Sequence, residues 1–137
     1  MGRLVTFATS NLNQFSLDWE GNANRIREAI KLAKDDGARY ITTPELSITG
    51  YGCLDHFLEQ DTVTHSWQML SLLLLDRELD GIIYDVGMPV RHNGVLFNSR
   101  IVVLDGKILL IRPKMSLGEL TVLTAHETHT DFKFSLL

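Results

Sequence analysis

The chain has a single cysteine, no basic block and no long apolar run among its 137 residues. One cysteine cannot form an internal disulfide, which indicates a reducing compartment, so we expect a cytoplasmic location. The longest apolar stretch, residues 69–75, is far shorter than the roughly 18–20 residues of a membrane span. With 13 basic and 17 acidic residues, the net charge is −4. We therefore expect neither a membrane nor a nucleic acid as partner.

The first third of the chain has the pattern of a strand–helix–strand unit. Residues 4–12 and 40–43 are rich in the apolar residues and threonines typical of strands. Between them, apolar residues recur at spacings of three and four, with Asp18 as a candidate N-cap and Gly37 as a candidate C-cap. This pattern predicts a parallel strand pair and an α/β fold. Glu45 follows the second strand, at the end where open α/β sheets bind ligands.

The rest of the sequence predicts one long helix and an antiparallel meander. The helix begins at residue 61 or 62 and ends near residue 78. An Asn-Gly pair at 93–94 and an Asp-Gly pair at 105–106 are strong hairpin signals. The three strands that they separate are residues 82–90, 95–104 and 107–111. Gly87, inside the first of these strands, marks a candidate β-bulge.

Two charged residues follow strand ends, each directly after a proline: Glu45 after Pro44, and Lys114 after Pro113. A carboxylate in such a place can act as a general base, and a nearby lysine can stabilise an oxyanion. Taken alone, each residue is more often a solvated loop charge. We expect the two to share one site only if the strands that carry them are neighbours in the sheet.

Other candidate sites are weaker. Cys53 lies in the loop after Glu45 and could serve as a nucleophile, but a lone small residue there is more often part of the packing. Gly50 and Gly52 flank a turn that lacks the further residues of a phosphate loop. A cluster near the C-terminus has metal-ligand spacing, but its default interpretation is a solvated polar segment, so we predict no metal site. Its members are His126, Glu127, His129 and Asp131.

Several motifs together resemble one family. They are Asn11-Leu12-Asn13-Gln14, Pro44-Glu45-Leu46, the run from Gly50 to His56, Asp85-Val86-Gly87-Met88-Pro89-Val90 and Arg112-Pro113-Lys114-Met115. This set resembles the N-terminal amidotransferase domain of eukaryotic glutamine-dependent NAD synthetase, which is a nitrilase-superfamily (carbon–nitrogen hydrolase) domain. The resemblance covers residues 1–117, the N-terminal part of such a domain. Residues 118–137 form a divergent tail that matches none of its motifs.

The resemblance implies an incomplete α-β-β-α sandwich of the nitrilase type and a Glu–Lys–Cys triad that hydrolyses the side-chain amide of glutamine. In this triad, Glu45 would be the general base and Lys114 the oxyanion stabiliser, while Tyr51 would line the glutamine pocket. The family's nucleophilic cysteine would lie downstream of Lys114, so we expect no nucleophile in this chain. Cys53 matches a non-catalytic position. We therefore expect no hydrolysis by this chain alone.

The resemblance also implies partners. Ammonia from glutamine would pass to a synthetase domain that uses ATP and magnesium to amidate deamido-NAD, so no cofactor is expected in this chain. Because the family is homo-oligomeric, full-length NAD synthetase subunits are a further candidate partner. Two interpretations stay open: a truncated glutaminase domain, or a non-catalytic interaction module that associates with the full-length synthetase.

Overall fold

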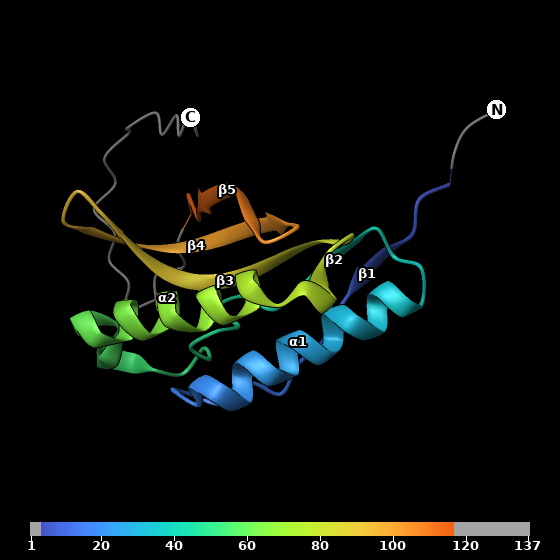
Figure 1. Ribbon diagram of the computed structural model, residues 1–137. Helices are drawn as coiled ribbons and strands as arrows, with labels where there is room; N and C mark the ends of the chain where they lie inside the picture. The colour runs from blue at the N-terminus through green and yellow to red at the C-terminus, as the bar shows by residue number, and fades with distance from the viewer. Residues whose placement is uncertain (1–3, 117–137) are drawn as a thin grey trace.

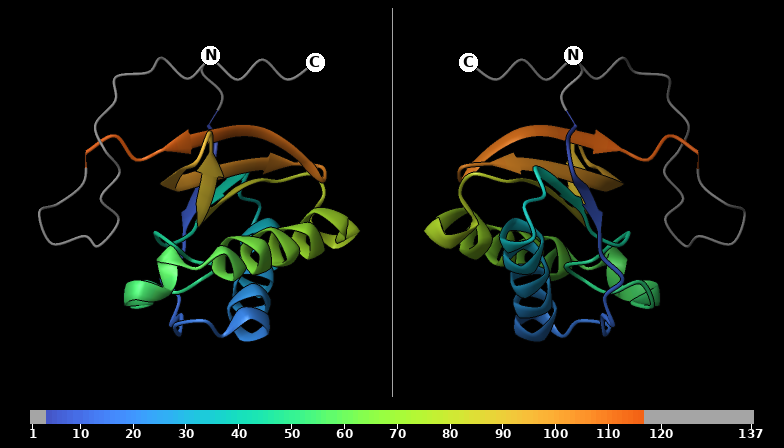
Figure 2. Two further views of the ribbon diagram at one scale, coloured as in Figure 1. Left: turned by 90° about the vertical axis from the view of Figure 1, so that its left-hand side faces the viewer. Right: turned by 90° about the vertical axis from the view of Figure 1, so that its right-hand side faces the viewer.

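The computed structural model describes residues 4–116 as one five-stranded mixed sheet with two long helices on one side of it (Figures 1 and 2). The strands lie in the order β1-β2-β3-β4-β5. In chain order, the elements are β1 (Phe7–Thr9), α1 (Trp19–Asp35), β2 (Tyr40–Thr42), the 3-10 helix η1 (Leu54–Leu58), α2 (Gln60–Leu75), the 3-10 helix η2 (Arg77–Leu79), β3 (Ile83–His92), β4 (Val95–Leu104) and β5 (Lys107–Pro113). The α/β class is therefore confirmed. Within the described part, none of the helices is both long and apolar enough to cross a membrane.

The strand–helix–strand unit predicted for the start of the chain is confirmed. β1 and β2 are parallel, with Phe7 opposite Tyr40. α1 begins where the Asp18 side chain accepts a hydrogen bond from the backbone N–H of Gly21. β1 is shorter than the predicted residues 4–12, because its ladder partner β2 has only three residues to pair with.

The predicted antiparallel meander is also confirmed. β3 pairs with β4, and β4 pairs with β5. Both residues of the Asn93-Gly94 turn and both residues of the Asp105-Gly106 turn have positive φ angles, as type I′ hairpin turns require. β5 runs to Pro113, which is further than the pattern predicted, so Lys114 follows the strand directly.

Gly87 does not form the predicted β-bulge. The register between β3 and β4 is continuous, with Gly87 opposite Arg100, and the irregular register lies between Val102 and Val103, where β4 pairs with β5. A Cβ atom at position 87 would lie 2.4 Å from the backbone nitrogen of Leu46. The glycine is therefore needed for the close approach of the segment after β2 to β3.

Gly87→Ala is expected to destabilise the full chain by about 1–3 kcal/mol, the usual cost of overpacking. The added methyl group would also lie 3.1 Å from the backbone carbonyl carbon of Glu45. The midpoint of urea unfolding measures this loss. Gly52→Ala is the matched control, because its Cβ would meet only the end of the Ser16 side chain, at 3.2 Å. Equal midpoints for the two variants would contradict this explanation of Gly87.

α2 begins at Gln60, one or two residues before the predicted start at residue 61 or 62, but it ends at Leu75 rather than near residue 78. Asp76 has an extended backbone and caps η2, because its side chain accepts a hydrogen bond from the backbone N–H of Glu78 inside that helix. Arg27 of α1 forms an ion pair with Asp76. The end of α2 is therefore fixed by Asp76 and Arg27, neither of which belongs to the apolar pattern that predicted this helix.

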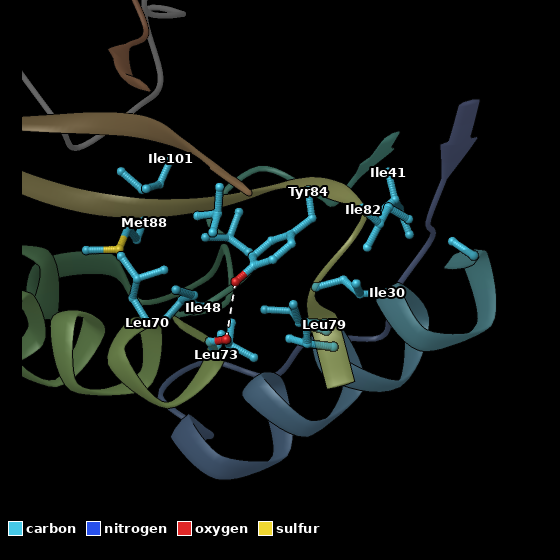
Figure 3. Close-up of a cluster of buried hydrophobic side chains, with 14 of the residues drawn as sticks. Ile30, Ile41, Ile48, Leu70, Leu73, Leu79, Ile82, Tyr84, Met88 and Ile101 are labelled. Atoms are coloured by element: carbon cyan, nitrogen blue, oxygen red, sulfur yellow. Dashed lines mark hydrogen bonds between the residues drawn. The ribbon is translucent and has the colours of Figure 1, made fainter. Parts of the chain in front are cut away.

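The core lies between the sheet and the two helices (Figure 3). Ile30 of α1 and Leu70 of α2 are fully buried in one cluster with Tyr84 and Met88 of β3. The Tyr84 hydroxyl donates a hydrogen bond to the carbonyl oxygen of Leu73 at 3.3 Å. This bond gives a buried polar group its partner.

The opposite face of the sheet carries no helix among residues 4–116 (Figure 2). Side chains alternate between the two faces of a strand, so Phe7 of β1 and Leu110 of β5 point to this open face, where both are exposed. One sheet covered by helices on one side is half of an α-β-β-α sandwich. The structure therefore agrees with the incomplete sandwich that was predicted.

Candidate functional site

Glu45 and Lys114 meet although the strands that precede them are not neighbours. Glu45 follows β2 and Lys114 follows β5, and β3 and β4 lie between those two strands. Lys114 Nζ nevertheless lies 2.9 Å from Glu45 Oε1. Our condition that the two strands be neighbours was therefore wrong. The segment after β2 approaches β3 closely at Gly87, and the two long side chains then meet above the sheet.

The Glu45–Lys114 pair is partly exposed, with 34% and 37% of the two side chains accessible. Burial by itself raises the pKa of Glu45. Hydrogen bonds from Lys114 and Asn98, and the positive charges of Lys114 and Arg100, lower it. The lowering effects are larger in sum, so the pKa of Glu45 lies below its ordinary value. The hydrogen bond to Glu45 in turn raises the pKa of Lys114. At neutral pH, the site therefore presents an ionised carboxylate beside an ammonium group.

The pair opens onto a cavity of about 300 Å³. The cavity wall consists of Glu45, Gly87, Asn98, Ser99, Arg100, Arg112, Pro113 and Lys114. Three of these residues are cationic and one is anionic, so positive charge is in excess. Such a cavity suits a small polar molecule with a carbonyl or anionic group.

A buried ion pair lies beside the site. Asp85 of β3 is 2% exposed and accepts a hydrogen bond from Arg100 Nη1 at 2.7 Å. The hydroxyl groups of Tyr40 and Thr42 donate to the same carboxylate. Burial and the bond to Asp85 raise the pKa of Tyr40 to about 12. Because Arg100 Nη1 also donates to the carbonyl oxygen of Thr43 at 2.5 Å, the ion pair is tied to the segment after β2.

Hydroxyl groups fix this segment against β3. Thr43 Oγ1 donates to the carbonyl oxygen of Asp85 at 2.9 Å, and Ser47 Oγ lies 2.8 Å from Thr43 Oγ1. Ser47 Oγ also accepts a hydrogen bond from the backbone N–H of Gly87 at 3.0 Å. Glu45 lies between Thr43 and Ser47, so the backbone is anchored on both sides of it.

The two other candidate residues of this loop lie away from the cavity wall. The side chain of Tyr51 is exposed. The main cause of the raised pKa of Lys114 is its hydrogen bond with Glu45, and Tyr51 makes a smaller contribution in the same direction. Its role in a glutamine pocket stays a prediction. Cys53 is buried in a small cluster with Leu46, and its Sγ lies 3.2 and 3.3 Å from two backbone carbonyl oxygens. Burial raises the pKa of the Cys53 thiol, which fits a packing role.

Sequence reasoning missed two β4 residues, Asn98 and Arg100. Asn98 Nδ2 donates a hydrogen bond to Glu45 Oε1 at 2.5 Å, and Arg100 holds the segment that precedes Glu45. A signal was present, because Asn98-Ser99-Arg100 is a run of polar residues inside the otherwise largely apolar strand Val95–Leu104. Polar residues in a central strand need hydrogen-bond partners, and such a run therefore marks a site.

In the described part of the chain, no group of three or more His, Cys, Asp or Glu residues could hold a metal ion. The candidate cluster of His126, Glu127, His129 and Asp131 lies outside the described residues. The divergent tail, residues 118–137, also lies outside them. The weak metal signal and the domain boundary at residue 117 therefore stay predictions.

Comparison with known proteins identifies a family. The model of the carbon-nitrogen hydrolase family matches residues 6–132. The glutamine-dependent NAD(+) synthetases of Saccharomyces cerevisiae and Homo sapiens are each 56% identical to the chain over 118 residues, which is 86% of its length. The matched region covers only 16% of the yeast protein and 17% of the human protein.

Solved structures show the same fold. A glutamine-dependent NAD(+) synthetase from Cytophaga hutchinsonii has a TM-score of 0.76 at 30% identity, over 81% of this chain and 19% of that protein. An amidase from Nesterenkonia sp. has a TM-score of 0.72 at 21% identity, over 87% of this chain and 45% of that protein, and supports the fold alone. Since the family model matches most of the chain and the fold agrees, the chain belongs to the carbon–nitrogen hydrolase family.

Proposed function

We propose that the chain forms part of the glutamine-hydrolysing domain of a glutamine-dependent NAD synthetase. One observation carries this proposal. Glu45 and Lys114, which are 69 positions apart in the sequence, meet at 2.9 Å on the wall of a cavity in a carbon–nitrogen hydrolase fold. The 56% identity to proteins named glutamine-dependent NAD(+) synthetases supports glutamine as the amide that is hydrolysed.

In this proposal, Glu45 is the general base. Its lowered pKa keeps it ionised at neutral pH, so it can accept the proton of an attacking nucleophile. Lys114 brings a positive charge to the same cavity wall. That charge stabilises the oxyanion that forms when the nucleophile attacks the amide carbonyl group.

Cys53 is not the nucleophile of the proposed reaction. It is the single cysteine of the chain, and a reactive thiolate needs an exposed position and a lowered pKa, whereas Cys53 is buried and its pKa is raised. The nucleophilic cysteine therefore comes from another segment of the synthetase. We expect the purified 137-residue chain to hydrolyse no glutamine above background.

The released ammonia serves the synthetase in amidating deamido-NAD, a reaction that needs ATP and magnesium. In this proposal, those cofactors bind elsewhere in the synthetase, since the chain corresponds to about one sixth of its relatives' length. The residues of this chain contribute the base, the oxyanion charge and part of the substrate cavity.

A chimera tests the proposed function. Residues 4–116 replace the matching segment of the Saccharomyces cerevisiae synthetase, to which the chain is 56% identical. We expect this chimera to hydrolyse glutamine, and to make NAD from deamido-NAD with either glutamine or ammonium as the nitrogen source. A chimera that makes NAD with ammonium but not with glutamine would refute the proposal.

A further inference from the structure

Asn98 connects the two reactive groups of the site. Its side-chain Nδ2 donates a hydrogen bond to Glu45 Oε1 at 2.5 Å, and its backbone carbonyl oxygen accepts one from the backbone N–H of Lys114 at 2.8 Å. Asn98 is 6% exposed, and its strand is paired on both sides, with β3 and with β5. From one position in a strand that is paired on both sides, Asn98 therefore contacts both Glu45 and Lys114.

The orientation of the Asn98 amide follows from chemistry. The pKa of Glu45 is lowered, so at neutral pH its carboxylate can only accept hydrogen bonds. The amide NH₂ group, and not the amide oxygen, must therefore face Glu45. The bond leaves no buried side-chain nitrogen or oxygen of the described residues without a partner.

The two oxygens of Glu45 are not equivalent. Oε1 accepts from Asn98 Nδ2 at 2.5 Å and from Lys114 Nζ at 2.9 Å. A carboxylate oxygen has two lone pairs in the carboxylate plane, so both sites of Oε1 are occupied. No group within residues 4–116 donates a hydrogen bond to Oε2. Among the described residues, the lone pairs of Oε2 are therefore not used in hydrogen bonds and can accept a proton.

We propose that Asn98 is a positioning residue that commits Oε1 of Glu45 to fixed hydrogen bonds and so selects Oε2 as the oxygen that takes the proton. This inference rests on the proposed role of Glu45 as general base. The proton passes from the nucleophile to Oε2, the electron pair of the broken bond stays on the nucleophile, and Glu45 becomes a neutral carboxylic acid.

Lys114 alone cannot set this orientation. Its ammonium group has three donors that rotate about a flexible stem, and its side chain is 37% exposed. The amide of Asn98 is planar, nearly buried and carried by a central strand. Asn98 therefore fixes the direction of the carboxylate, whereas Lys114 supplies charge.

The first test uses the full 137-residue chain and does not depend on activity. Carboxyl-carbon NMR titration of Glu45 is compared among the native chain, Asn98→Leu and Asn98→Asp. We expect the Glu45 pKa to lie below its ordinary value in the native chain and to rise in Asn98→Leu, because a donor is lost. It should rise further in Asn98→Asp, which keeps the size of the side chain and adds a like charge.

Tyr84→Phe is the control. Tyr84 of β3 packs in the core between the sheet and the helices, away from the cavity wall, and its hydroxyl donates to the carbonyl oxygen of Leu73 at 3.3 Å. Tyr84→Phe also removes one buried hydrogen bond, and we expect its Glu45 pKa to equal that of the native chain. An unchanged Glu45 pKa in both Asn98 variants would overturn the positioning role.

The second test measures glutamine hydrolysis by the chimera. Asn98→Leu is expected to lower kcat by about 10–100-fold with little change in KM, because a misdirected base is less effective while the substrate still binds. The acid limb of the pH profile should move to higher pH as the Glu45 pKa rises. A rise in KM alone would overturn the positioning role. Failure of the unsubstituted chimera to hydrolyse glutamine would instead overturn the proposed function.

Discussion

Glu45→Gln in the yeast chimera is expected to lower the rate of glutamine hydrolysis by about 10²–10⁴-fold, the usual contribution of a general base. Glutamine has nearly the shape of glutamate, and its side-chain oxygen can still accept hydrogen bonds from Asn98 and Lys114, so the local structure should persist. What is lost is the basic oxygen. The measurement is the rate of glutamate release under saturating glutamine.

Ammonium separates this effect from a loss of folding. With ammonium as the nitrogen source, NAD synthesis by Glu45→Gln should equal that of the unsubstituted chimera, because the hydrolysis step is bypassed. Glutamine hydrolysis within a factor of about three of the unsubstituted chimera would show that Glu45 is not the base, since even a modest general base contributes about 10²-fold.

The same carboxylate predicts a pH dependence of stability. The folded-state pKa of Glu45 is lowered from its ordinary value of 4.5, so its stabilising contribution is complete above pH 4.5 and is lost as the pH falls through the lowered pKa. The pKa of Lys114 is raised above 10.5, so its contribution is lost as the pH rises through that raised value. The urea midpoints of the native chain and of Glu45→Gln should therefore differ between pH 4.5 and pH 10.5. The two midpoints should converge as the pH falls through the lowered pKa of Glu45.

Asp85→Asn is expected to destabilise the 137-residue chain by about 3 kcal/mol, the lower end of the cost of breaking a buried ion pair. Asp85 is 2% exposed, whereas its partner Arg100 is 34% exposed, and water will relieve part of the loss. The variant also weakens the anchor of Arg100, which holds the Thr43 carbonyl oxygen. The urea midpoint and the unfolding slope give the change in free energy.

Asp80→Asn is the control for Asp85→Asn. Asp80 pairs with Arg77 at 3.4 Å, and their side chains are 36% and 79% exposed. Exposed pairs contribute about 0–1 kcal/mol, so this variant should unfold close to the native midpoint. Equal losses in the two variants would mean that burial of Asp85 is not what makes its ion pair important.

Local elements were predictable because their signals are local. The Asp18 cap, the helix that follows it and the two hairpin turns each depend on residues a few positions apart. The ends of β1 and α2 were predicted less well. β1 stops where its partner strand stops, and α2 stops where Asp76 caps η2 and pairs with Arg27. Both limits come from contacts with other elements.

The sequence identified Gly87 as a special position in its strand, but the predicted structural cause, a β-bulge, was wrong. A glycine inside a strand indicates either a bulge or a close approach of another backbone. The pattern of the strand cannot distinguish the two, and the bulge was the wrong choice. Only the tertiary structure shows that close approach is the reason, because the backbone nitrogen of Leu46 would lie 2.4 Å from a Cβ atom at position 87.

The alternative of a non-catalytic interaction module stays a prediction. The open face of the sheet exposes apolar side chains such as Phe7 and Leu110, which shows that this face is available.

The sequence by itself determined the α/β class, the family and the two residues that carry the proposed chemistry, because strand pattern, turn residues and the motifs around Glu45 and Lys114 are all local. Tertiary structure alone decided that these residues meet across two intervening strands, and that Asn98 fills one side of the carboxylate. The physical reason is that the environment of a carboxylate depends on which donors surround it in space. Those donors come from β4 and from the end of β5, which lie far from Glu45 in the sequence.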